Sequence, residues 1–512
     1  MQTKNFYITT PIYYPSGQPH MGHAYSSIIA DVFARFMRND SYKVFFLTGT
    51  DEHGLKIQKA AEKAGLDPLL YCNEISEVFK NLAKKLNLSN DDFIRTTEKR
   101  HYASVNDLWN RLIKSGDIYL SKYKGWYSVS DEAYYNDDEV IEKDGKKIST
   151  FSGSPVEWVE EESFFFKLSA WEKKLLEFYS KNEKFILPAP RRNEVVNFVK
   201  SGLKDLSVSR TSFTWGIKVP NKDNHIIYVW LDALTNYLSA LNFPNTTDKL
   251  YKNFWPASLH VIGKDILRFH AIYWPAFLFA AKIKPPSRIF GHGWILSGDE
   301  KMSKSKGNIL NPLEIIDIYG IDQLRYYLMK TVSHGSDGNI SLDGLERCIN
   351  SDLANNYGNL CQRTFSFIKN NCNSKVEKTK KISTTDKQLI KQTESLTKNL
   401  RKEMQNQNLN IYIKSTIDIS FLTNKYINDE QPWKLKKINI EKMNNVLHLT
   451  LEQIAKISIL LNPIIPSATT KVLNALNVKN KLRNLSFLDK KNVLSNKVMI
   501  EDLDILFKKI KR

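Results

Sequence analysis

The N-terminal part of the chain alternates apolar runs with stretches of helical period. Strand-like runs occupy residues 6–14 and 42–49, whereas residues 24–37 repeat apolar side chains at helical spacing. A Pro-Ser-Gly turn separates the first strand from the first helix. Strand, turn and helix in this order are typical of a parallel α/β sheet. We therefore expect residues 1–115 to form the first half of a doubly wound, Rossmann-like domain.

The pattern changes twice further along. Residues 116–225 show short strands and turns, including an Asp-Gly turn, and are predicted to be an inserted domain. Strand–helix alternation returns at 226–300, which we assign to the second half of the α/β domain. Residues 301–350 are expected to form a loop and a connecting region, and 351–512 an all-α bundle with long amphipathic stretches and almost no glycine.

Composition favours large folded cores over disorder. The 512 residues are 42% hydrophobic, and neither an 18-residue apolar stretch nor a basic-apolar leader is present. We therefore expect a cytoplasmic protein without a membrane partner. The four cysteines (Cys72, Cys348, Cys361 and Cys372) lack CxxC spacing, which argues against a disulfide framework and against a cysteine-based zinc site.

Positive charge is concentrated in the C-terminal third. Of the net charge of +19, about +15 falls within residues 351–512. A polyanion that contacts this third is one explanation. The other explanation is a compositional bias toward Lys, Asn and Ile, as low-GC genomes produce.

Two short motifs carry the chemistry. PHMGH (19–23) stands where the first helix begins, and KMSKS (301–305) lies far downstream. Free N–H groups at a helix start favour anions, and imidazoles there can donate to a phosphate. Gly22 leaves room for a flat ring against the backbone. Lys301 and Lys304 add cations for a leaving pyrophosphate. Each motif alone is more often a capped helix start or a solvated loop, but their order and context together favour nucleotide binding.

The two motifs resemble the signature sequences of class I aminoacyl-tRNA synthetases, and five ordered segments resemble the methionyl-tRNA synthetases. They are TTPIYYPSGQPHMGH (9–23), TGTDEHG (48–54), YVWLDALTNY (228–237), IGKDILRFHAIYWPA (262–276) and GHGWILSGDEKMSKS (291–305). The resemblance covers residues 5–350 and continues more faintly to about 435. It implies a catalytic domain split by a connective insertion and followed by an anticodon-binding bundle.

The resemblance also implies a methionine pocket. Asp51 matches the carboxylate that holds the substrate ammonium group, as a zwitterion requires. A thioether suits an aromatic box with polar contacts to sulfur, here from Tyr237 and His270. The complete set of matched positions is Ile12, Tyr14, Asp51, Trp230, Ala233, Leu234, Tyr237, Phe269, His270 and Trp274. Any one of these aromatics alone is more simply interpreted as core packing.

ATP with Mg²⁺ is the cofactor that the resemblance implies. Matched catalytic positions are His20, His23, Lys301 and Lys304; matched ATP positions are Gly22, Gly263, Asp265, His292 and Lys304. The methionine carboxylate attacks the α-phosphate to give methionyl-adenylate and pyrophosphate, and the terminal ribose hydroxyl of tRNA(Met), initiator or elongator, then takes the acyl group. No protein nucleophile is needed, because the work is positioning and charge stabilisation.

The family pattern breaks at its zinc knuckle. Ser128 and Asp131 stand where a CxxC pair would be, and Ser149 and Ser152 where the later ligands would be. Serine is not a plausible zinc ligand at neutral pH, so we expect no structural zinc. The insertion must then be held by strand pairing and by its aromatic residues, which are Trp126, Tyr127, Tyr134, Tyr135, Phe151 and Trp158.

Three residues of the helical third match anticodon-reading positions of the family. Asn359 and Arg363 are four residues apart, and Trp433 follows downstream. Unpaired bases are read by stacking on aromatic rings and by hydrogen bonds to their edges. An Asn/Arg pair at this spacing is also common on helix surfaces, so Trp433 carries the argument. The family often carries a further C-terminal domain, whereas EDLDILFKKIKR (501–512) is expected to be one last helix or a short tail, and a monomer is expected.

Three other functions compete. A cysteinyl enzyme of the same class requires zinc-ligating cysteines in its pocket, which this chain lacks. A non-catalytic RNA-binding paralogue has no use for HMGH and KMSKS. An adenylyltransferase for small molecules leaves the basic helical third without a purpose.

Overall fold

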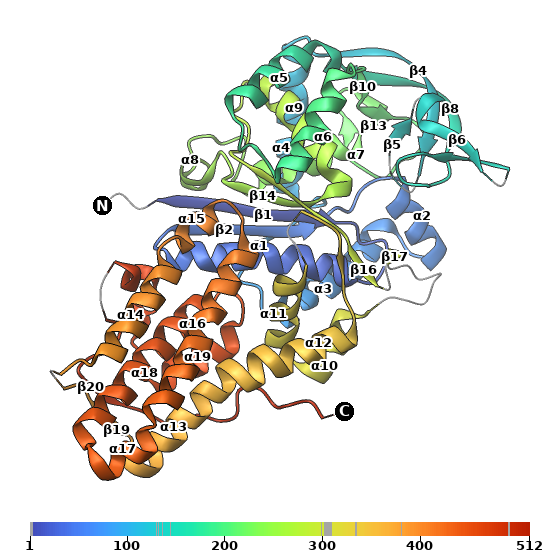
Figure 1. Cartoon of the computed structure of the whole chain (residues 1–512). Coiled ribbons are helices and arrows are strands. Elements are labelled where there is room, and N and C mark those ends of the chain that lie inside the picture. The colour runs from blue at the N-terminus through green and yellow to red at the C-terminus, as the bar shows by residue number, and fades with distance from the viewer. Residues whose placement is uncertain are drawn as a thin grey trace.

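The computed structural model describes residues 4–129, 131, 133–135, 137–143, 145–297, 300–301, 310–332, 335–379, 381–489 and 492–511. Figure 1 shows an α/β domain at the centre, strands and helices of the insertion above it and a helical bundle below. Within these described ranges, no helix has both the length and the apolar character needed to cross a bilayer.

A six-stranded parallel sheet forms the centre of the molecule. Its order is β3 (Asp92–Arg95), β2 (Lys43–Thr50), β1 (Asn5–Tyr13), β14 (Leu259–Gly263), β15 (Ile289–His292) and β9 (Ile186–Leu187). The chain runs outward from β1 through β2 to β3 and later outward from β14 to β15. The order therefore reverses between β1 and β14, which is where doubly wound sheets bind ligands.

Helices cover both faces of this sheet. They are α1 (Met21–Asn39), α2 (Leu55–Ala64), α3 (Pro68–Lys85), α4 (Lys99–Lys114), α7 (Val229–Ser239), α8 (Lys249–Phe254) and α9 (Trp274–Ala280). Helix α1 is buried along nearly its whole length, and its side chains belong to the same hydrophobic core as those of the C-terminal helices. The α/β domain and the helical third are therefore packed together through α1.

Strand β1 is interrupted before it reaches its end. Its register against β2 shifts between Thr9 and Ile12, where Thr10 donates a hydrogen bond to Thr48 (2.7 Å). A bulge re-aims the side chains that follow it. Ile12 and Tyr14 are thereby turned toward the point where the strand order reverses.

The insertion is built on a long antiparallel ladder. Its elements are β4 (Ile118–Ser128), β5 (Ala133–Tyr135), β6 (Val140–Lys143), β7 (Lys146–Ser149), β8 (Glu157–Phe166), α5 (Glu172–Lys181), α6 (Ala189–Lys200), β10 (Leu206–Ser207), β11 (Ser209–Arg210), β12 (Lys218–Val219) and β13 (Lys222–Ile227). Strand β9 lies inside the predicted insertion, yet it pairs with β15 in the central sheet. Two residues are too short a run to reveal this from sequence.

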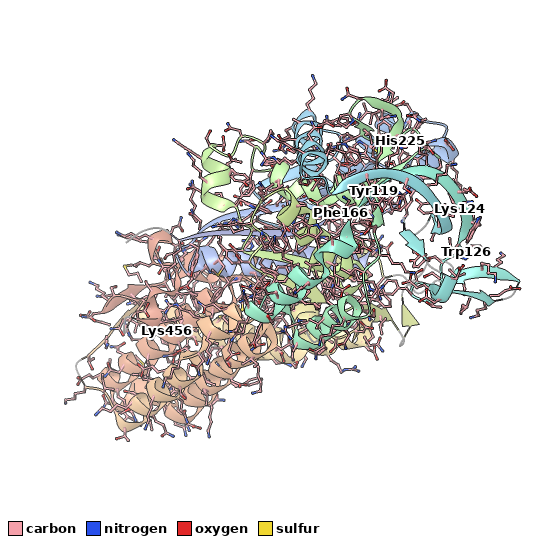
Figure 2. All side chains as sticks on the ribbon, turned by 90° about the horizontal axis from the view of Figure 1, so that it is seen from above. Tyr119, Lys124, Trp126, Phe166, His225 and Lys456 are labelled. Atoms are coloured by element: carbon pink, nitrogen blue, oxygen red, sulfur yellow. The ribbon has the colours of Figure 1, made fainter. Side chains whose placement is uncertain are left out.

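Cross-strand pairs stabilise the ladder, which Figure 2 shows as an arched ribbon at one side of the molecule. Lys124 on β4 pairs with Glu160 on β8 (2.7 Å), and the rings of Trp126 and Trp158 meet edge to face at 5.2 Å. At the other end of the ladder, Phe166 packs on Phe277 of α9 at 4.8 Å. These contacts fit the expectation that aromatic packing and strand pairing hold the insertion.

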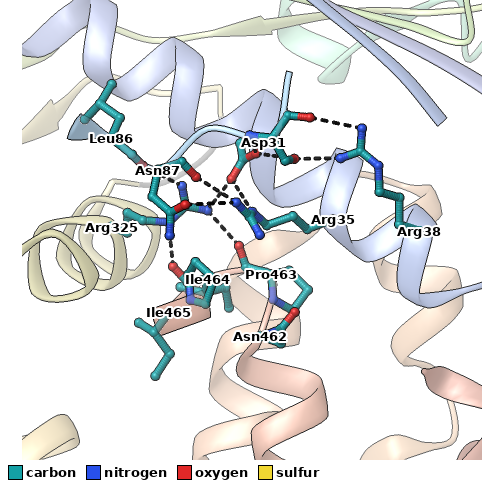
Figure 3. Close-up of polar contacts among 12 residues, drawn as sticks. Asp31, Arg35, Arg38, Leu86, Asn87, Arg325, Asn462, Pro463, Ile464 and Ile465 are labelled. Atoms are coloured by element: carbon teal, nitrogen blue, oxygen red, sulfur yellow. Dashed lines mark hydrogen bonds and ion pairs between the residues drawn. The ribbon is translucent and has the colours of Figure 1, made fainter. Parts of the chain in front are cut away.

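A small sheet and two helices connect the sheet domain to the bundle. They are β16 (Ile295–Ser297), β17 (Glu300–Lys301), β18 (Gly338–Asn339), α10 (Pro312–Tyr319) and α11 (Ile321–Thr331). The buried Arg325 of α11 binds Asp31 of α1 (2.6 Å) and the carbonyl oxygens of Pro463 and Ile464 (both 2.8 Å), as Figure 3 shows. This cluster joins α1, the connection and the bundle.

In its described residues, the C-terminal third is mainly helical. Its helices are α12 (Leu342–Cys348), a π-helical segment (Ile349–Gly358), α13 (Asn359–Cys372), α14 (Thr384–Thr397), α15 (Leu400–Gln405), α16 (Leu409–Glu430), α17 (Pro432–Ile438), α18 (Ile440–Leu461) and α19 (Pro466–Ala475). It also contains a strand pair, β19 (Lys375–Glu377) with β20 (Lys497–Met499), which the sequence analysis did not predict. Residues 501–511 are a non-helical tail, the second of the two endings considered.

Candidate active site

A cavity of about 610 Å³ opens at the carboxyl ends of β1, β14 and β15. This is the point where the strand order reverses. Of the side chains expected to contact substrates, its lining includes Ile12, Tyr14, His20, Gly22, His23, Asp51, Trp230, Ala233, Leu234, Tyr237, Gly263, Asp265, His270 and His292. Residues that are up to 280 positions apart in sequence therefore line one cavity.

The two histidines of HMGH cap helix α1, which begins at Met21 with His20 as its N-cap. The Gly22 N–H donates to Nδ1 of His20, and the His20 N–H donates to Nδ1 of His23, both at 3.1 Å. A backbone N–H can only donate, so both Nδ1 atoms accept and the ring protons lie on Nε2. Capping and phosphate binding are therefore compatible, because capping turns each imidazole into an Nε2–H donor.

The flat ring that lies over Gly22 is that of His20. A Cβ at Gly22 would stand 2.9 Å from Cε1 of His20, so this close approach needs glycine. The rings of His20 and His23 stack at 3.8 Å. Burial, with the nearby charges of His20 and Lys56, holds the pKa of His23 well below its usual value. His23 is therefore neutral at pH 7.

The wall of the cavity that faces the HMGH motif is formed by the ends of β14 and β15. A Cβ at Gly263 would stand 2.4 Å from Oδ1 of Asp265, so glycine lets this exposed carboxylate fold back toward the strand end. Ser26 of α1 bonds Nε2 of His292 (2.7 Å), and Nδ1 of His292 bonds the Gly293 carbonyl (2.8 Å). A carboxylate at this place suits ribose hydroxyl groups.

The other half of the cavity is aromatic, and its lining residues Trp230, Tyr237 and His270 are buried. Nδ1 of His270 donates to the Ile266 carbonyl (3.0 Å), so Nε2 accepts from the Tyr237 hydroxyl (2.8 Å). Burial lowers the pKa of His270 to about 4 and keeps the ring neutral. Asp51, which is 2% exposed, also lines the cavity, with its backbone N–H bonded to the Tyr13 carbonyl (2.9 Å). A carboxylate thus shares one cavity with an apolar pocket.

Two expected pocket residues stand behind this wall. Phe269 stacks on Trp230 with ring centroids 3.6 Å apart and planes 6° from parallel. Trp274 is fully buried and packs against Tyr237 at 6.2 Å. Neither is part of the cavity lining, so each supports a residue that is.

The lining also includes residues that the sequence analysis missed. Lys56, on the first turn of α2, places Nζ 5.0 Å from the ring centre of Tyr14. Trp294 donates from Nε1 to Asp265 (3.3 Å). Both lie beside quoted motifs, Lys56 after TGTDEHG and Trp294 within GHGW. Ser26 lies one helical turn after Gly22 and therefore on the same face of α1, so helical spacing could have identified it as a lining residue.

The KMSKS motif falls mostly outside the described residues. The backbone of Lys301 belongs to β17, where it pairs with Leu296 of β16. Lys304, for which a catalytic and an ATP-binding role were expected, lies outside the part of the chain that the structure describes. The described backbone does bring the start of the motif to the strand that follows His292.

The positions of the family's zinc knuckle do not fit a zinc ion. Ser152 and Ser154 donate to the two carboxylate oxygens of Asp131, and Tyr135 donates to it at 2.8 Å. Ser149 accepts from the Ser152 N–H (3.4 Å). One carboxylate with hydroxyl groups lacks the nitrogen and sulfur ligands of structural zinc sites. Among the described residues, no group of three His, Cys, Asp or Glu is arranged to hold a metal ion.

The three expected anticodon-reading residues lie on α13 and α17. Asn359 is exposed at the first residue of α13, and Trp433 is 45% exposed at the start of α17. Arg363 is held by Asn424 (2.8 Å) and Asn428 (2.6 Å) of α16. Helices α17 and α13 are linked by a hydrogen bond from Lys436 to Asn371 (2.8 Å).

A doubly wound sheet that is split by an insertion, with a histidine-capped helix at its switch point and a helical C-terminal domain, is the architecture of a class I aminoacyl-tRNA synthetase. Residues 6–365 match the family described as tRNA synthetases class I (M), and residues 376–512 match the anticodon binding domain of methionyl tRNA ligase.

Individual relatives agree over nearly the whole chain. Methionine–tRNA ligase of Brucella suis is 47% identical, over 93% of this chain and 93% of its own. The Rickettsia conorii enzyme is 48% identical, over 98% and 99% respectively. The structure of the Mycobacterium tuberculosis methionyl-tRNA synthetase in complex with methionyl-adenylate superimposes with a TM-score of 0.96 at 41% identity, covering 99% and 100%. The chain therefore belongs to the methionyl-tRNA synthetases.

Proposed function

We propose that this chain activates L-methionine with ATP to methionyl-adenylate and pyrophosphate and then charges tRNA(Met), initiator and elongator alike. One observation carries the proposal. A single cavity combines Asp51 and an aromatic pocket with the Nε2–H donors of His20 and His23. An amino acid and a nucleotide bound in these two halves meet between them, where the carboxylate reaches the α-phosphate.

The amino-acid half is proposed to select methionine by shape and by its ammonium group. Asp51 accepts the ammonium group, and Trp230, Ala233 and Leu234 form the wall around the thioether. Tyr237 and His270 orient each other by their hydrogen bond, which fixes the polar edge that faces the sulfur. A neutral His270 fits a neutral thioether, because an imidazolium there would be buried without an anion.

The nucleotide half is proposed to hold ATP with Mg²⁺. His20 and His23 donate to phosphate oxygens while Gly263 and Asp265 hold the ribose and His292 the base side. Lys301 and Lys304 are assigned to the leaving pyrophosphate. Mg²⁺, when bound, neutralises phosphate charge; the protein contributes donors of fixed geometry, which stabilise charge as it develops.

The helical domain is proposed to read the anticodon through Asn359, Arg363 and Trp433. Arg363 is already oriented by two asparagines, so ordering it on binding costs little entropy. Residues 351–512 are proposed as this domain, with 1–115 and 226–300 as the split catalytic domain, 116–225 as a zinc-free insertion and 301–350 as the connection.

Location and assembly are further proposals. All four cysteines are free thiols, as a reducing compartment keeps them, which supports a cytoplasmic location. A monomer is proposed as the state of assembly.

Pyrophosphate exchange into ATP, measured with each of the twenty amino acids and without tRNA, tests the activation step. We expect exchange with methionine alone. His270→Ala and Trp230→Ala should raise the KM for methionine by tenfold or more, whereas Trp158→Ala, on the exposed face of the insertion, should leave it unchanged. Exchange with another amino acid would refute the pocket assignment. RNA binding without any exchange would favour the non-catalytic paralogue.

A further inference from the structure

Helix α7 forms the aromatic wall of the cavity and carries one charged residue. Trp230, Ala233 and Leu234 line the cavity, whereas the charged residue, Asp232, is not part of the lining. Asp232 has no solvent exposure at all. A buried carboxylate is costly unless it is fully hydrogen-bonded, so its partners indicate what it does.

Both oxygens of Asp232 are bound by imidazoles from other elements. Oδ2 contacts Nδ1 of His53 at 2.7 Å, and Oδ1 contacts Nε2 of His101 on α4 at 2.6 Å. Both histidines are at most 1% exposed. Nδ1 of His101 contacts Ser239 at the end of α7 (2.9 Å), and Nε2 of His53 contacts the Tyr102 hydroxyl (3.2 Å). The carboxylate therefore ties α7 to α4 and to the segment after β2.

The carboxylate remains ionised in this environment. Burial by itself raises the pKa of Asp232, but attraction to His53 and hydrogen bonds from His101 and His53 outweigh it and hold the pKa at about 2. Ionised acceptors form short hydrogen bonds that are about twice as strong as neutral ones. The two imidazole contacts are thus stiff.

His53 stands two residues after Asp51 in the TGTDEHG segment, and its neighbours Asp51, Glu52 and Gly54 make contacts of their own. The Asp51 N–H bonds the Tyr13 carbonyl (2.9 Å), and Glu52 pairs with Arg95 (2.7 Å). The Gly54 N–H bonds the carbonyl of Trp215 (3.1 Å). The side chain of His53 bonds to Asp232 on α7, so it joins the carboxylate side of the cavity to the aromatic side.

We propose that Asp232 is a positioning residue that, through His53 and His101, sets the distance between Asp51 and the aromatic wall on α7. The inference rests on the proposed function, because Asp51 receives the ammonium group there. A zwitterion with an apolar tail is recognised by two points at a fixed separation. Sites of this kind must be held to within about 0.5 Å, and a misplacement of about 1 Å costs up to 100-fold in rate.

Asp232→Asn is the test, because it keeps the shape and removes the charge. The Asn amide presents N–H groups to one of the two imidazoles, which must then change tautomer or move. We expect the KM for methionine in pyrophosphate exchange to rise about tenfold, with the KM for ATP changed less than twofold. Discrimination against ethionine, which is one methylene longer than methionine, should fall as well, because it depends on the same distance. A well-shaped pocket discriminates one methylene by about 10–200-fold.

Asp386→Asn is the matched control. Asp386 on α14 is also a buried carboxylate, and it accepts from the Tyr426 hydroxyl (2.6 Å) and the Ser383 N–H (2.9 Å), far from the cavity. It should lose thermal stability without any change in KM or in ethionine discrimination. Tyr102→Phe, which removes only the hydrogen bond to His53, is the milder second variant, with an expected two- to threefold rise in the methionine KM.

The outcomes separate the two proposals. The positioning role is overturned, and the proposed function stands, if the wild-type enzyme catalyses exchange with methionine while Asp232→Asn and Tyr102→Phe leave the methionine KM and the ethionine discrimination unchanged. Equal rises in the KM for methionine and ATP, or the same change in Asp386→Asn, also overturn it, because they indicate general loosening. A wild-type enzyme without methionine-dependent exchange contradicts the proposed function itself.

Discussion

Arg325 is expected to be the strongest single stabilising residue between the catalytic half and the helical bundle. Its guanidinium has no solvent exposure, and it donates to the Asp31 carboxylate and to the carbonyl oxygens of Leu86, Pro463 and Ile464 (Figure 3). These partners come from α1, from the end of α3 and from the turn before α19. Replacing Arg325 with Met keeps an unbranched apolar stem and removes every one of these donors.

The expected cost follows from what the substitution leaves behind. Breaking a buried ion pair costs about 3–5 kcal/mol, because one charge stays buried. Asp31 keeps its contacts with Arg35 (2.7 Å) and with Ser89 (2.6 Å), which places the cost near the lower end, at about 3 kcal/mol. For a domain of this size, a loss of about 3 kcal/mol lowers the urea midpoint by roughly 1 M.

Two optical signals can locate the effect. Nine of the ten tryptophans lie before residue 351, so fluorescence reports mainly on the catalytic half, whereas far-UV circular dichroism reports on the helices of both the catalytic half and the helical bundle. In Arg325→Met, we expect the dichroism transition to shift to lower urea by more than the fluorescence transition. Arg111→Met is the matched control: its pair with Asp107 is about one-third exposed, and losing it should cost less than about 0.5 kcal/mol.

The reasoning can fail in two ways. A midpoint shift in Arg325→Met no larger than that in Arg111→Met would show that the buried pair contributes nothing net. Coincident shifts of both signals would show that the cluster stabilises one cooperative unit and does not join two. Asp31→Asn combined with Arg325→Met should cost less than the sum of the single variants, because the double variant removes both charges of the Asp31–Arg325 pair and leaves neither of them buried without the other.

Three further predictions address pH, the insertion and the tRNA. The folded-state pKa of His270, about 4, lies below its ordinary 6.5, so its contribution of about 3 kcal/mol to the free energy of unfolding is present above pH 6.5 and lost as pH falls toward 4. Between pH 4.5 and 7.5, the free energy of unfolding from urea titrations should therefore depend less on pH in His270→Gln than in the wild type. Parallel pH dependences of the two proteins would contradict this. Asp131→Asn should lower the melting temperature while a chelator has no effect on wild type; stoichiometric zinc by elemental analysis would contradict this. Trp433→Ala should reduce kcat/KM for tRNA charging by about 10–100-fold, from the loss of about 1–3 kcal/mol of base stacking, with pyrophosphate exchange intact; an equal fall in exchange would remove the anticodon assignment.

The sequence by itself determined the architecture, because its signals are local. Apolar periodicity marks strands and helices within a window of about ten residues, and motifs such as HMGH and TGTDEHG mark the ends of strands. The doubly wound sheet, the insertion and the helical C-terminal domain follow from these signals and are confirmed. Short elements were the exception: β9 and the β19–β20 pair are two and three residues long, too short for a periodic pattern.

Only the tertiary structure decided how the site residues share their work. Phe269 and Trp274 stand behind the cavity wall and not on it, because a helix face is assigned by three-dimensional packing. The tautomers of His20 and His23 depend on backbone N–H groups that point at the two rings only when the start of α1 has formed. The tie from Asp232 to His53 joins side chains 179 residues apart. Such long-range contacts leave no periodic trace in a single sequence, because the free energy that forms them comes from burial and not from neighbouring residues.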